Sequence, residues 1–340
     1  MDRTGQIVGV VGAGRFGVAL ARHLAKSRIS TRLWGRDTKR LQSWERHGGP
    51  MDLFPGVRFP SSISLVDDPK KVLEADILLL AVPTQALRSC LMDLFQAKRP
   101  NVDNVRVFVL LSKGLEDQTS ELPHEILQTA FGISRSAVLS GPTFAEELIQ
   151  GLPMAMVAAS QDISIAESIQ KLFSSERLRV YTSKDVLGVA LGGALKNIFS
   201  IAAGISDGLR LGHSARASLV SRAMAEMMRI ARSLGAQSIT LAGLSGLGDL
   251  LLSTTSPKSR NHRLGVLIAN GLSPSQFFAQ PNFLAEGALS VKALLQRIKG
   301  LNIETPIVTE VHRVLFEAAS PKDALERLLE RSLKSETESF

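Results

Sequence analysis

The chain has 340 residues, of which 44% are hydrophobic and 21% charged, a formal net charge of +8 and one cysteine, Cys90. This length predicts two domains, and the composition is that of a globular protein rather than a disordered one. A single cysteine excludes an intrachain disulfide and a cysteine metal cluster, and no metal site is predicted. The positive charge favours anionic partners, but its dispersal argues against nucleic acid and for small ligands.

The first half of the chain alternates short apolar runs with amphipathic stretches. Strands that alternate with helical patterns predict a doubly wound, parallel α/β sheet of the Rossmann type over residues 1–184. The longest apolar run, Ile77–Val82, is too short to span a bilayer, and no signal-like segment is seen, so a cytoplasmic protein without a membrane span is expected. The predicted strands are Ile7–Val11, Thr31–Trp34, Ile77–Val82, Arg106–Leu111, Ser136–Leu139, Met154–Ala158 and Leu178–Tyr181.

A glycine-rich turn follows the first predicted strand at once. Gly12-Ala-Gly14-Arg-Phe-Gly17 has the G-x-G-x-x-G spacing and opens a helical pattern over Val18–Ala25. The first glycine permits the tight turn, the second lets backbone approach a pyrophosphate, and the third allows close packing of helix on strand. The helix N-terminus also favours phosphate. The motif predicts a dinucleotide site; the alternative is a turn that serves packing only.

The end of the second strand bears on which dinucleotide binds. An acid that binds the ribose 2′-hydroxyl is usual there, whereas here Trp34 is followed by Gly35-Arg36-Asp37. Arg36, with Lys39 or Arg40 nearby, could hold a 2′-phosphate, and Asp37 lies slightly late for the hydroxyl. The pattern favours NADP(H) without excluding NAD(H). The alternative for Arg36 is a solvated loop charge.

The second half, residues 185–340, is predicted to be an all-helical domain, and its first helix carries an isolated lysine. Lys196 lies in an apolar, small-residue stretch from Gly188 to Gly204 that contains no acid. Burial lowers the pKa of a lysine, so its amine can donate or accept a proton near neutral pH. With the glycine-rich turn, this predicts a nicotinamide dehydrogenase whose acid/base group is Lys196. The alternative is a stem packed in the core with its head in solvent.

Further polar groups stand where ligands bind in open α/β sheets or at helix starts. Lys113 and the segment Ser140–Ala145 follow the carboxyl ends of predicted strands. Asp249 ends a glycine-rich loop, where it could bind Lys196 or a substrate hydroxyl, or cap the next helix. Ser259-Arg260-Asn261 suits a phosphate at a helix N-terminus, the alternative being a capped helix with a solvent-facing arginine.

These stretches together resemble the bacterial NAD(P)-dependent glycerol-3-phosphate dehydrogenases, over about Ile7 to Arg327. The resemblance is carried by Leu80-Ala-Val-Pro-Thr-Gln-Ala-Leu87, Ser112-Lys-Gly-Leu-Glu116, Ser140-Gly-Pro-Thr-Phe-Ala145, Leu191-Gly-Gly-Ala-Leu-Lys-Asn197, Gly246-Leu-Gly-Asp249, Thr255-Ser-Pro-Lys-Ser-Arg-Asn261 and Ala285-Glu-Gly287.

The resemblance implies a homodimer that transfers hydride reversibly between NAD(P)H and dihydroxyacetone phosphate, giving sn-glycerol 3-phosphate for glycerophospholipid synthesis. It implies that Lys196 donates and accepts the proton, with Lys113 and Asp249 beside it. The implied substrate contacts are Lys113, Gly141, Thr143, Lys196, Asp249, Ser259, Arg260 and Asn261. The implied cofactor contacts, in addition to Gly12, Gly14 and Gly17 of the motif, are Arg15, Phe16, Arg36, Lys113, Ala145, Arg260, Leu284 and Glu286.

The chain departs from the family pattern at three places. Arg15-Phe16 stands where Ser-Trp is common, Ala190 where a glutamate is frequent, and His47-Gly-Gly-Pro50 where a His-Asn pattern is usual. None of these touches the proposed catalytic residues. Two alternatives remain: a β-hydroxy-acid-type dehydrogenase such as a ketopantoate-like reductase, against which the phosphate-binding residues argue, and a non-catalytic dinucleotide sensor, which would not need Lys196.

Overall fold

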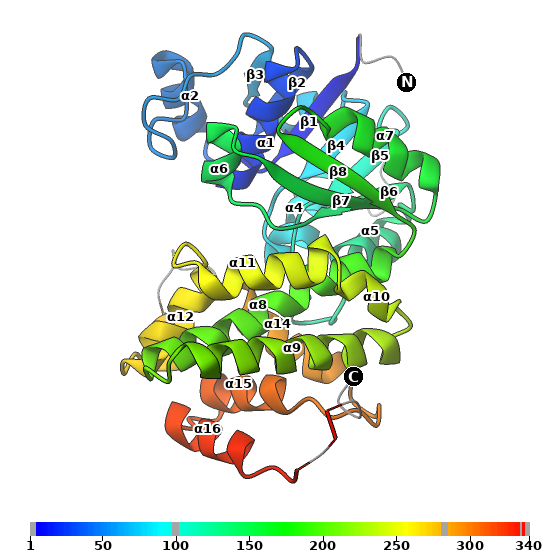
Figure 1. Cartoon of the computed structure of the whole chain (residues 1–340). Helices are drawn as coiled ribbons and strands as arrows, with labels where there is room; N and C mark the ends of the chain where they lie inside the picture. Colours follow the sequence, from blue (N-terminus) through cyan, green and yellow to red (C-terminus); the bar gives the residue numbers. More distant parts are fainter. Residues whose placement is uncertain (1–4, 97–101, 280–284, 334, 337–340) are drawn as a thin grey trace. The chain divides into compact units, whose positions relative to one another are not determined.

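The computed structural model of the chain describes residues 5–96, 102–279, 285–333 and 335–336, and it divides into two compact units (Figure 1). Unit 1 comprises residues 1–112 and 123–186, and unit 2 comprises residues 113–122 and 187–340. The segment 113–122, which carries Lys113, therefore groups with the helical part of the chain although it follows a strand of the sheet. The domain boundary predicted at residue 184 placed residues 113–122 in the first domain.

Unit 1 is built on an eight-stranded sheet with the order β3-β2-β1-β4-β5-β6-β7-β8. The predicted strands are all present, and the doubly wound α/β class is confirmed. The prediction of a wholly parallel sheet was wrong at one place, because β6 and β7 pair antiparallel. The strands are β1 (Ile7–Val11), β2 (Ser30–Trp34), β3 (Ile63–Val66), β4 (Ile77–Leu80), β5 (Val107–Leu110), β6 (Ser136–Ser140), β7 (Met154–Ala159) and β8 (Leu178–Ser183).

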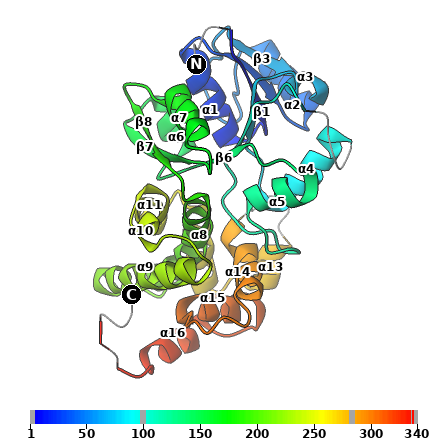
Figure 2. The ribbon, with the colours of Figure 1, turned by 90° about the vertical axis from the view of Figure 1, so that its right-hand side faces the viewer.

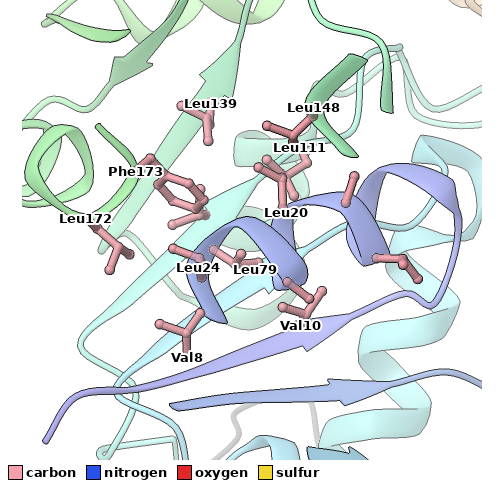
Figure 3. Close-up of a cluster of buried hydrophobic side chains, with 14 of the residues drawn as sticks. Val8, Val10, Leu20, Leu24, Leu79, Leu111, Leu139, Leu148, Leu172 and Phe173 are labelled. Carbon is pink, nitrogen blue, oxygen red and sulfur yellow. The ribbon is translucent and has the colours of Figure 1, made fainter. Parts of the chain in front are cut away.

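Helices cover both faces of this sheet. Figure 3 shows the core on one face, where Val8 and Val10 of β1 point toward Leu20 and Leu24 of α1. The alternation along β1 directs Gly9 to the other face, where a Cβ would lie 2.7 Å from the carbonyl oxygen of Val72. Figure 2 shows α4 and α5 together, away from α6 and α7. The helices are α1 (Arg15–Lys26), α2 (Thr38–His47), α3 (Pro69–Val72), α4 (Thr84–Phe95), α5 (Pro123–Phe131), α6 (Ala145–Gln150) and α7 (Ile163–Phe173).

In the part of unit 2 that the structure describes, every regular element is helical, as predicted. A short π-helical turn, η1 (Leu244–Gly248), precedes α11, and α15 and α16 lie side by side in Figures 1 and 2. The helices are α8 (Val186–Gly208), α9 (His213–Ser233), α10 (Ser238–Leu241), α11 (Asp249–Thr255), α12 (Arg260–Ala269), α13 (Pro274–Phe278), α14 (Glu286–Arg297), α15 (Pro306–Phe316) and α16 (Pro321–Leu329).

Helix α8 is mostly buried within the protein. Its glycines allow other backbone to approach closely: a Cβ at Gly192 would lie 2.8 Å from the carbonyl oxygen of Ser245 in η1, and one at Gly204 would lie 1.9 Å from that of His262 in α12. The small-residue stretch around Lys196 is thus explained by close helix packing. The helix is also long and apolar enough to cross a membrane, but 83% of its most apolar window is buried inside the protein, as in a core helix.

Candidate active site

The glycine-rich turn joins β1 to α1 next to β4, where the strand order reverses, and this is the place where open α/β sheets bind ligands. Gly12 has φ +118°, and a Cβ there would lie 2.5 Å from the carbonyl oxygen of Ala81. A Cβ at Gly17 would lie 2.1 Å from the carbonyl oxygen of Gly12. Both positions therefore need glycine for the turn and for the packing of α1 on the sheet.

Gly14 differs from the other two glycines because open space surrounds it. A Cβ there would meet no atom within 4 Å, so packing within the protein does not require glycine. Gly14 is the N-cap of α1, no side chain caps the helix, and its first turn contains no acid. The start of α1 therefore has open space beside a residue without a side chain. This arrangement fits a pyrophosphate, which needs close approach of the backbone and hydrogen-bond donors.

Arg15 and Phe16, which depart from the family pattern, both have structural contacts. The Arg15 guanidinium forms a salt bridge with Glu146 of α6 at 2.6 Å, and its carbon Cζ lies 4.7 Å from the centre of the Phe54 ring. Phe16 is half-buried against the core of unit 1. In this structure, Arg15 thus ties α1 to α6 and to the loop after α2. A phosphate contact by Arg15 would compete with the bond to Glu146.

Several charged residues follow the end of β2, and they differ in whether they make hydrogen bonds or salt bridges within the protein. Asp37 caps α2, accepting a hydrogen bond from the Arg40 backbone N–H at 3.0 Å, so its carboxylate is already engaged. The Arg40 guanidinium forms a salt bridge with Asp52 at 2.6 Å. Arg36 is exposed, and among the residues that the structure describes it makes no hydrogen bond or ion pair. Arg36 is therefore better placed than Arg40 to hold a 2′-phosphate.

One further segment of unit 1, Ser140–Ala145, was singled out by the sequence. Gly141 follows β6 with φ +146°, and a Cβ there would lie 2.9 Å from the carbonyl oxygen of Ala155, so the tight turn requires glycine. The hydroxyl of Thr143 donates to the carbonyl oxygen of Gly141 at 3.3 Å. Ala145 begins α6 and is buried. The segment thus places a hydroxyl and a helix start at the carboxyl end of a strand.

Unit 2 contains a cluster of charged side chains around Asp249. This residue begins α11 and is 2% exposed; its Oδ2 lies 2.5 Å from Nζ of Lys113, and its Oδ1 lies 3.1 Å from Nζ of Lys196. The interpretation of Asp249 as a helix cap is wrong, because its carboxylate binds two lysines instead. The interpretation of Lys196 as a snorkelling side chain also fails, since its side chain is only 12% exposed.

The cluster shifts the proton affinities of two of its members. Burial is the largest influence on Lys196 and lowers the pKa; Asp249 opposes this, Lys113 and Arg260 add to it, and the pKa falls to about 8. Burial alone would raise the pKa of Asp249, but the two neighbouring ammonium groups outweigh it and hold that pKa below its ordinary value. Lys196 can therefore exchange a proton near neutral pH while Asp249 stays ionised.

Two residues of this cluster were missed by the sequence analysis. Ser253 accepts a hydrogen bond from Nζ of Lys196 at 2.8 Å, and it lies one helical turn after Asp249 on α11. Asn197 donates from Nδ2 to the carbonyl oxygen of Lys113 at 2.8 Å and so fixes the backbone that carries this lysine. The i, i+4 spacing from Asp249 would have indicated Ser253, whereas no local pattern indicates the bond of Asn197 to a residue 84 positions away.

The start of α12 contains three residues predicted to bind phosphate. Ser259 is the N-cap and accepts from the backbone N–H of His262 at 3.3 Å. Arg260 is exposed and makes no hydrogen bond or ion pair among the described residues, yet its charge acts on Lys196. Asn261 is buried, donating to Oδ1 of Asn197 and accepting from the N–H of Gly287. Asn261 thus connects α8, α12 and α14, and Arg260 supplies the exposed positive charge.

The remaining predicted cofactor contacts lie at the start of α14. Glu286 is buried in its first turn, whereas Leu284 lies outside the described residues. Within the part of the chain that the structure describes, no group of three or more His, Cys, Asp or Glu side chains is placed to hold a metal ion.

Comparisons with known proteins agree with this arrangement. Residues 7–166 match the family model for the N-terminus of NAD-dependent glycerol-3-phosphate dehydrogenase, and residues 185–326 match the model for its C-terminus. The glycerol-3-phosphate dehydrogenase [NAD(P)+] of Thioalkalivibrio sulfidiphilus is 41% identical over 97% of this chain and 98% of its own. That of Acidithiobacillus ferrooxidans is 42% identical over 96% of this chain and 94% of its own.

A solved structure gives the same result. The crystal structure of glycerol-3-phosphate dehydrogenase from Coxiella burnetii superposes with a TM-score of 0.87 at 34% identity, covering 96% of this chain and 99% of its own. Together, the two family models and these relatives span nearly the whole sequence. The chain belongs to the NAD-dependent glycerol-3-phosphate dehydrogenase family.

Proposed function

We propose that this chain catalyses the reversible reduction of dihydroxyacetone phosphate by NAD(P)H to sn-glycerol 3-phosphate. The observation that carries the proposal is the buried cluster in which Lys196, with a pKa of about 8, shares the Asp249 carboxylate with Lys113. A dehydrogenase needs a group that gives a proton to the carbonyl oxygen in one direction and removes it in the other. An amine that titrates near neutral pH suits both directions.

The residues of this cluster have separate roles in the proposed reaction. The nicotinamide, when bound, supplies the hydride. Lys196 as ammonium stabilises the charge that develops on the substrate oxygen and donates its proton there. Asp249 orients the ammonium, and Lys113 adds positive charge near the same oxygen. In the reverse direction, neutral Lys196 accepts the proton of the hydroxyl group.

Substrate binding is assigned to residues at the start of α12 and to residues that come directly after strand β6. Arg260 is proposed to hold the substrate phosphate, supported by its exposed guanidinium, which makes no hydrogen bond or ion pair among the described residues, and by its electrostatic effect on Lys196. Ser259 and the backbone N–H of Asn261 are proposed to assist at the start of α12. Gly141 and Thr143 are proposed as further substrate contacts. Fixing the phosphate would position the carbonyl for transfer.

Cofactor binding is assigned to the glycine-rich turn and the end of β2. Gly12, Gly14 and Gly17 are proposed to shape the pyrophosphate site, and Arg36 to hold a 2′-phosphate, which modestly favours NADPH over NADH. The remaining contacts proposed for the cofactor are Arg15, Phe16, Lys113, Ala145, Arg260, Leu284 and Glu286. We further propose that the chain acts as a cytoplasmic homodimer and that its product supplies phospholipid synthesis.

The reaction is tested by following nicotinamide absorbance with the purified chain, dihydroxyacetone phosphate and either NADPH or NADH. The Lys196→Met variant should lower turnover by roughly 10²–10⁴-fold while leaving NADPH affinity nearly unchanged. Lys292→Met, which removes an exposed lysine paired with Asp117, is the matched control and should keep the wild-type rate. Near-normal turnover of Lys196→Met would contradict the role of Lys196.

The same assay separates the two alternatives. Cofactor oxidation with a ketopantoate-like keto acid but not with dihydroxyacetone phosphate would indicate another dehydrogenase of this fold. Tight NADPH binding without turnover of either substrate would indicate a sensor.

A further inference from the structure

Arg15, the first residue of α1, has an acidic partner on another helix. Its Nε and Nη2 atoms lie 2.7 and 2.6 Å from the same oxygen, Oε1, of Glu146 in the first turn of α6. The first turn of α1 itself contains no acid, so this carboxylate comes from α6, which lies beside α1 in Figures 1 and 2. Glu146 thus pairs with the first side chain after Gly14, the glycine to which close approach of the pyrophosphate is assigned.

The packing of α6 on α1 does not depend on this ion pair. Leu148 and Ile149 of α6 are buried in the same core as Leu20 of α1. Arg22, about two turns after Arg15, also donates from Nη1 to the carbonyl oxygen of Ile149 at 3.1 Å. The two helices should therefore stay together when the ion pair is broken.

The ion pair can be exchanged for another partner of the guanidinium. The side chain of Arg15 is 47% exposed and that of Glu146 is 33% exposed. Exposed ion pairs contribute little free energy, because water screens the attraction and two side chains must be held in one geometry. The guanidinium also lies over the ring of Phe54, with Cζ 4.7 Å from the ring centre, and such a cation–π contact is weak where water has access.

A pyrophosphate is a stronger partner for this guanidinium than a single carboxylate. It carries two negative charges, and bonds from arginine to phosphate are frequently bidentate. A Cβ at Gly14 would meet no atom within 4 Å, so the residue before Arg15 leaves room for such a group. The chain therefore combines an open helix start with an adjacent arginine that already has an acidic partner, and the strength of that pair opposes any new bond of the arginine.

We propose that Glu146 competes with the pyrophosphate of the cofactor for Arg15, and so lowers the affinity of the chain for NADPH and NADH alike. The inference rests on the proposed cofactor site at the glycine-rich turn and adds a residue that sets its affinity. Arg15 would leave Glu146 for the pyrophosphate, and the strength of the ion pair is subtracted from the binding free energy. The opposing explanation is that Arg15 only braces α1 against α6, in which case loss of either partner weakens binding.

The sign of the change in cofactor affinity separates competition from bracing. Titrations of nicotinamide fluorescence with NADPH and with NADH give the Kd values. Glu146→Gln should lower both Kd values by about three- to fivefold, because the carboxylate no longer holds the guanidinium. Arg15→Gln should raise both by about fivefold, because a charge-assisted bond to the pyrophosphate is lost. The two cofactors should respond equally, since both contain the pyrophosphate.

A double variant tests whether the two effects have one origin. In an Arg15→Gln background, Glu146→Gln should leave both Kd values nearly unchanged. Glu176→Gln and Arg177→Gln, which each remove one exposed charge of unit 1, are the matched controls and should bind like wild type. The melting temperature of each variant without added cofactor should change by no more than about 2 °C, because an exposed ion pair contributes little.

Three results would overturn the proposal. The first is a Kd that rises or stays the same in Glu146→Gln. The second is a change confined to NADPH, which would assign the effect to the 2′-phosphate. The third is an undiminished effect of Glu146→Gln in the Arg15→Gln background, because Glu146 would then act through its own charge and not through Arg15.

Reduction of dihydroxyacetone phosphate, measured in parallel, distinguishes failure of this inference from failure of the proposed function. Wild-type protein that binds NADPH and turns over, with unchanged affinity in Glu146→Gln, would contradict this inference alone. Wild-type protein that binds neither cofactor would contradict the cofactor site itself and the competition with it.

Discussion

Lys196 shares the carboxylate of Asp249 with a second lysine: its Nζ lies 3.1 Å from Oδ1, while Oδ2 lies 2.5 Å from Nζ of Lys113. One negative charge thus serves two largely buried ammonium groups. Because burial also disfavours the charged amine, the pKa of Lys196 falls to about 8. The Asp249 carboxylate limits the fall in the pKa of Lys196 without abolishing it. The amine can therefore donate a proton in one direction of the reaction and accept one in the other.

The pH dependence of the two directions should therefore be opposite. Reduction of dihydroxyacetone phosphate needs the ammonium form of Lys196, so its kcat/KM should be highest below pH 8 and fall as the pH rises through about 8. Oxidation of glycerol 3-phosphate needs the neutral amine, so its kcat/KM should rise over the same range. Initial rates in both directions between about pH 6 and 10 test this. Parallel profiles for the two directions would contradict it.

Removing the shared carboxylate should move this titration. Asp249→Asn leaves the ammonium groups of Lys113 and Lys196 close together without an acid between them, so the pKa of Lys196 should fall further. The inflection for reduction should shift down by at least about one pH unit, with a loss of activity at about pH 8. Asp323→Asn, which changes an exposed carboxylate on α16, should leave the profile unchanged. An unshifted inflection in Asp249→Asn would mean that another group sets it.

The sequence predicted local features well because each depends on neighbouring residues. Gly12 is required by its own φ of +118°, and Gly17 by the carbonyl oxygen of Gly12, so both requirements lie within the turn. Lys196 was found because it stands alone in an apolar helix. By contrast, β3 is short and only Val66 in it is buried, so its pattern gave little signal. The antiparallel pairing of β6 with β7 depends on the path of the chain between them and not on composition.

Contacts between distant residues were beyond local patterns. Lys113 and Asp249 are separated by 136 positions, and Arg15 and Glu146 by 131. The resemblance to a family placed Lys113 and Asp249 together, but spacing alone left Asp249 equally suited to a helix cap. Neither the resemblance nor the spacing indicated that Arg15, a departure from the family pattern, pairs with Glu146 of α6. Asn261 was assigned to phosphate from its place at a helix start, although its side-chain amide joins two other helices.

Arg260 should contribute to substrate affinity more than to cofactor affinity. A hydrogen bond to a charged group contributes about 1.5–3 kcal/mol, so Arg260→Ala should raise the KM for dihydroxyacetone phosphate by roughly 10–100-fold. Arg263→Ala, at an exposed position about one turn later on α12, is the matched control and should have little effect. Steady-state kinetics with each substrate varied in turn make the comparison. An unchanged KM for the phosphorylated substrate would remove Arg260 from the phosphate site.

Arg36 should determine the preference between the two nicotinamide cofactors. Its guanidinium is exposed at the end of β2 and has no internal hydrogen bond or ion pair among the described residues, whereas Asp37 is engaged at the N-cap of α2. Arg36→Gln should therefore weaken NADPH binding about tenfold, because a charge-assisted bond to the 2′-phosphate is lost. NADH binding should stay nearly constant, since NADH lacks that phosphate. Titrations of nicotinamide fluorescence give both Kd values directly, with Lys39→Gln as the control for a general loss of positive charge. An equal change for the two cofactors would place Arg36 away from the 2′-phosphate and leave the preference to other residues.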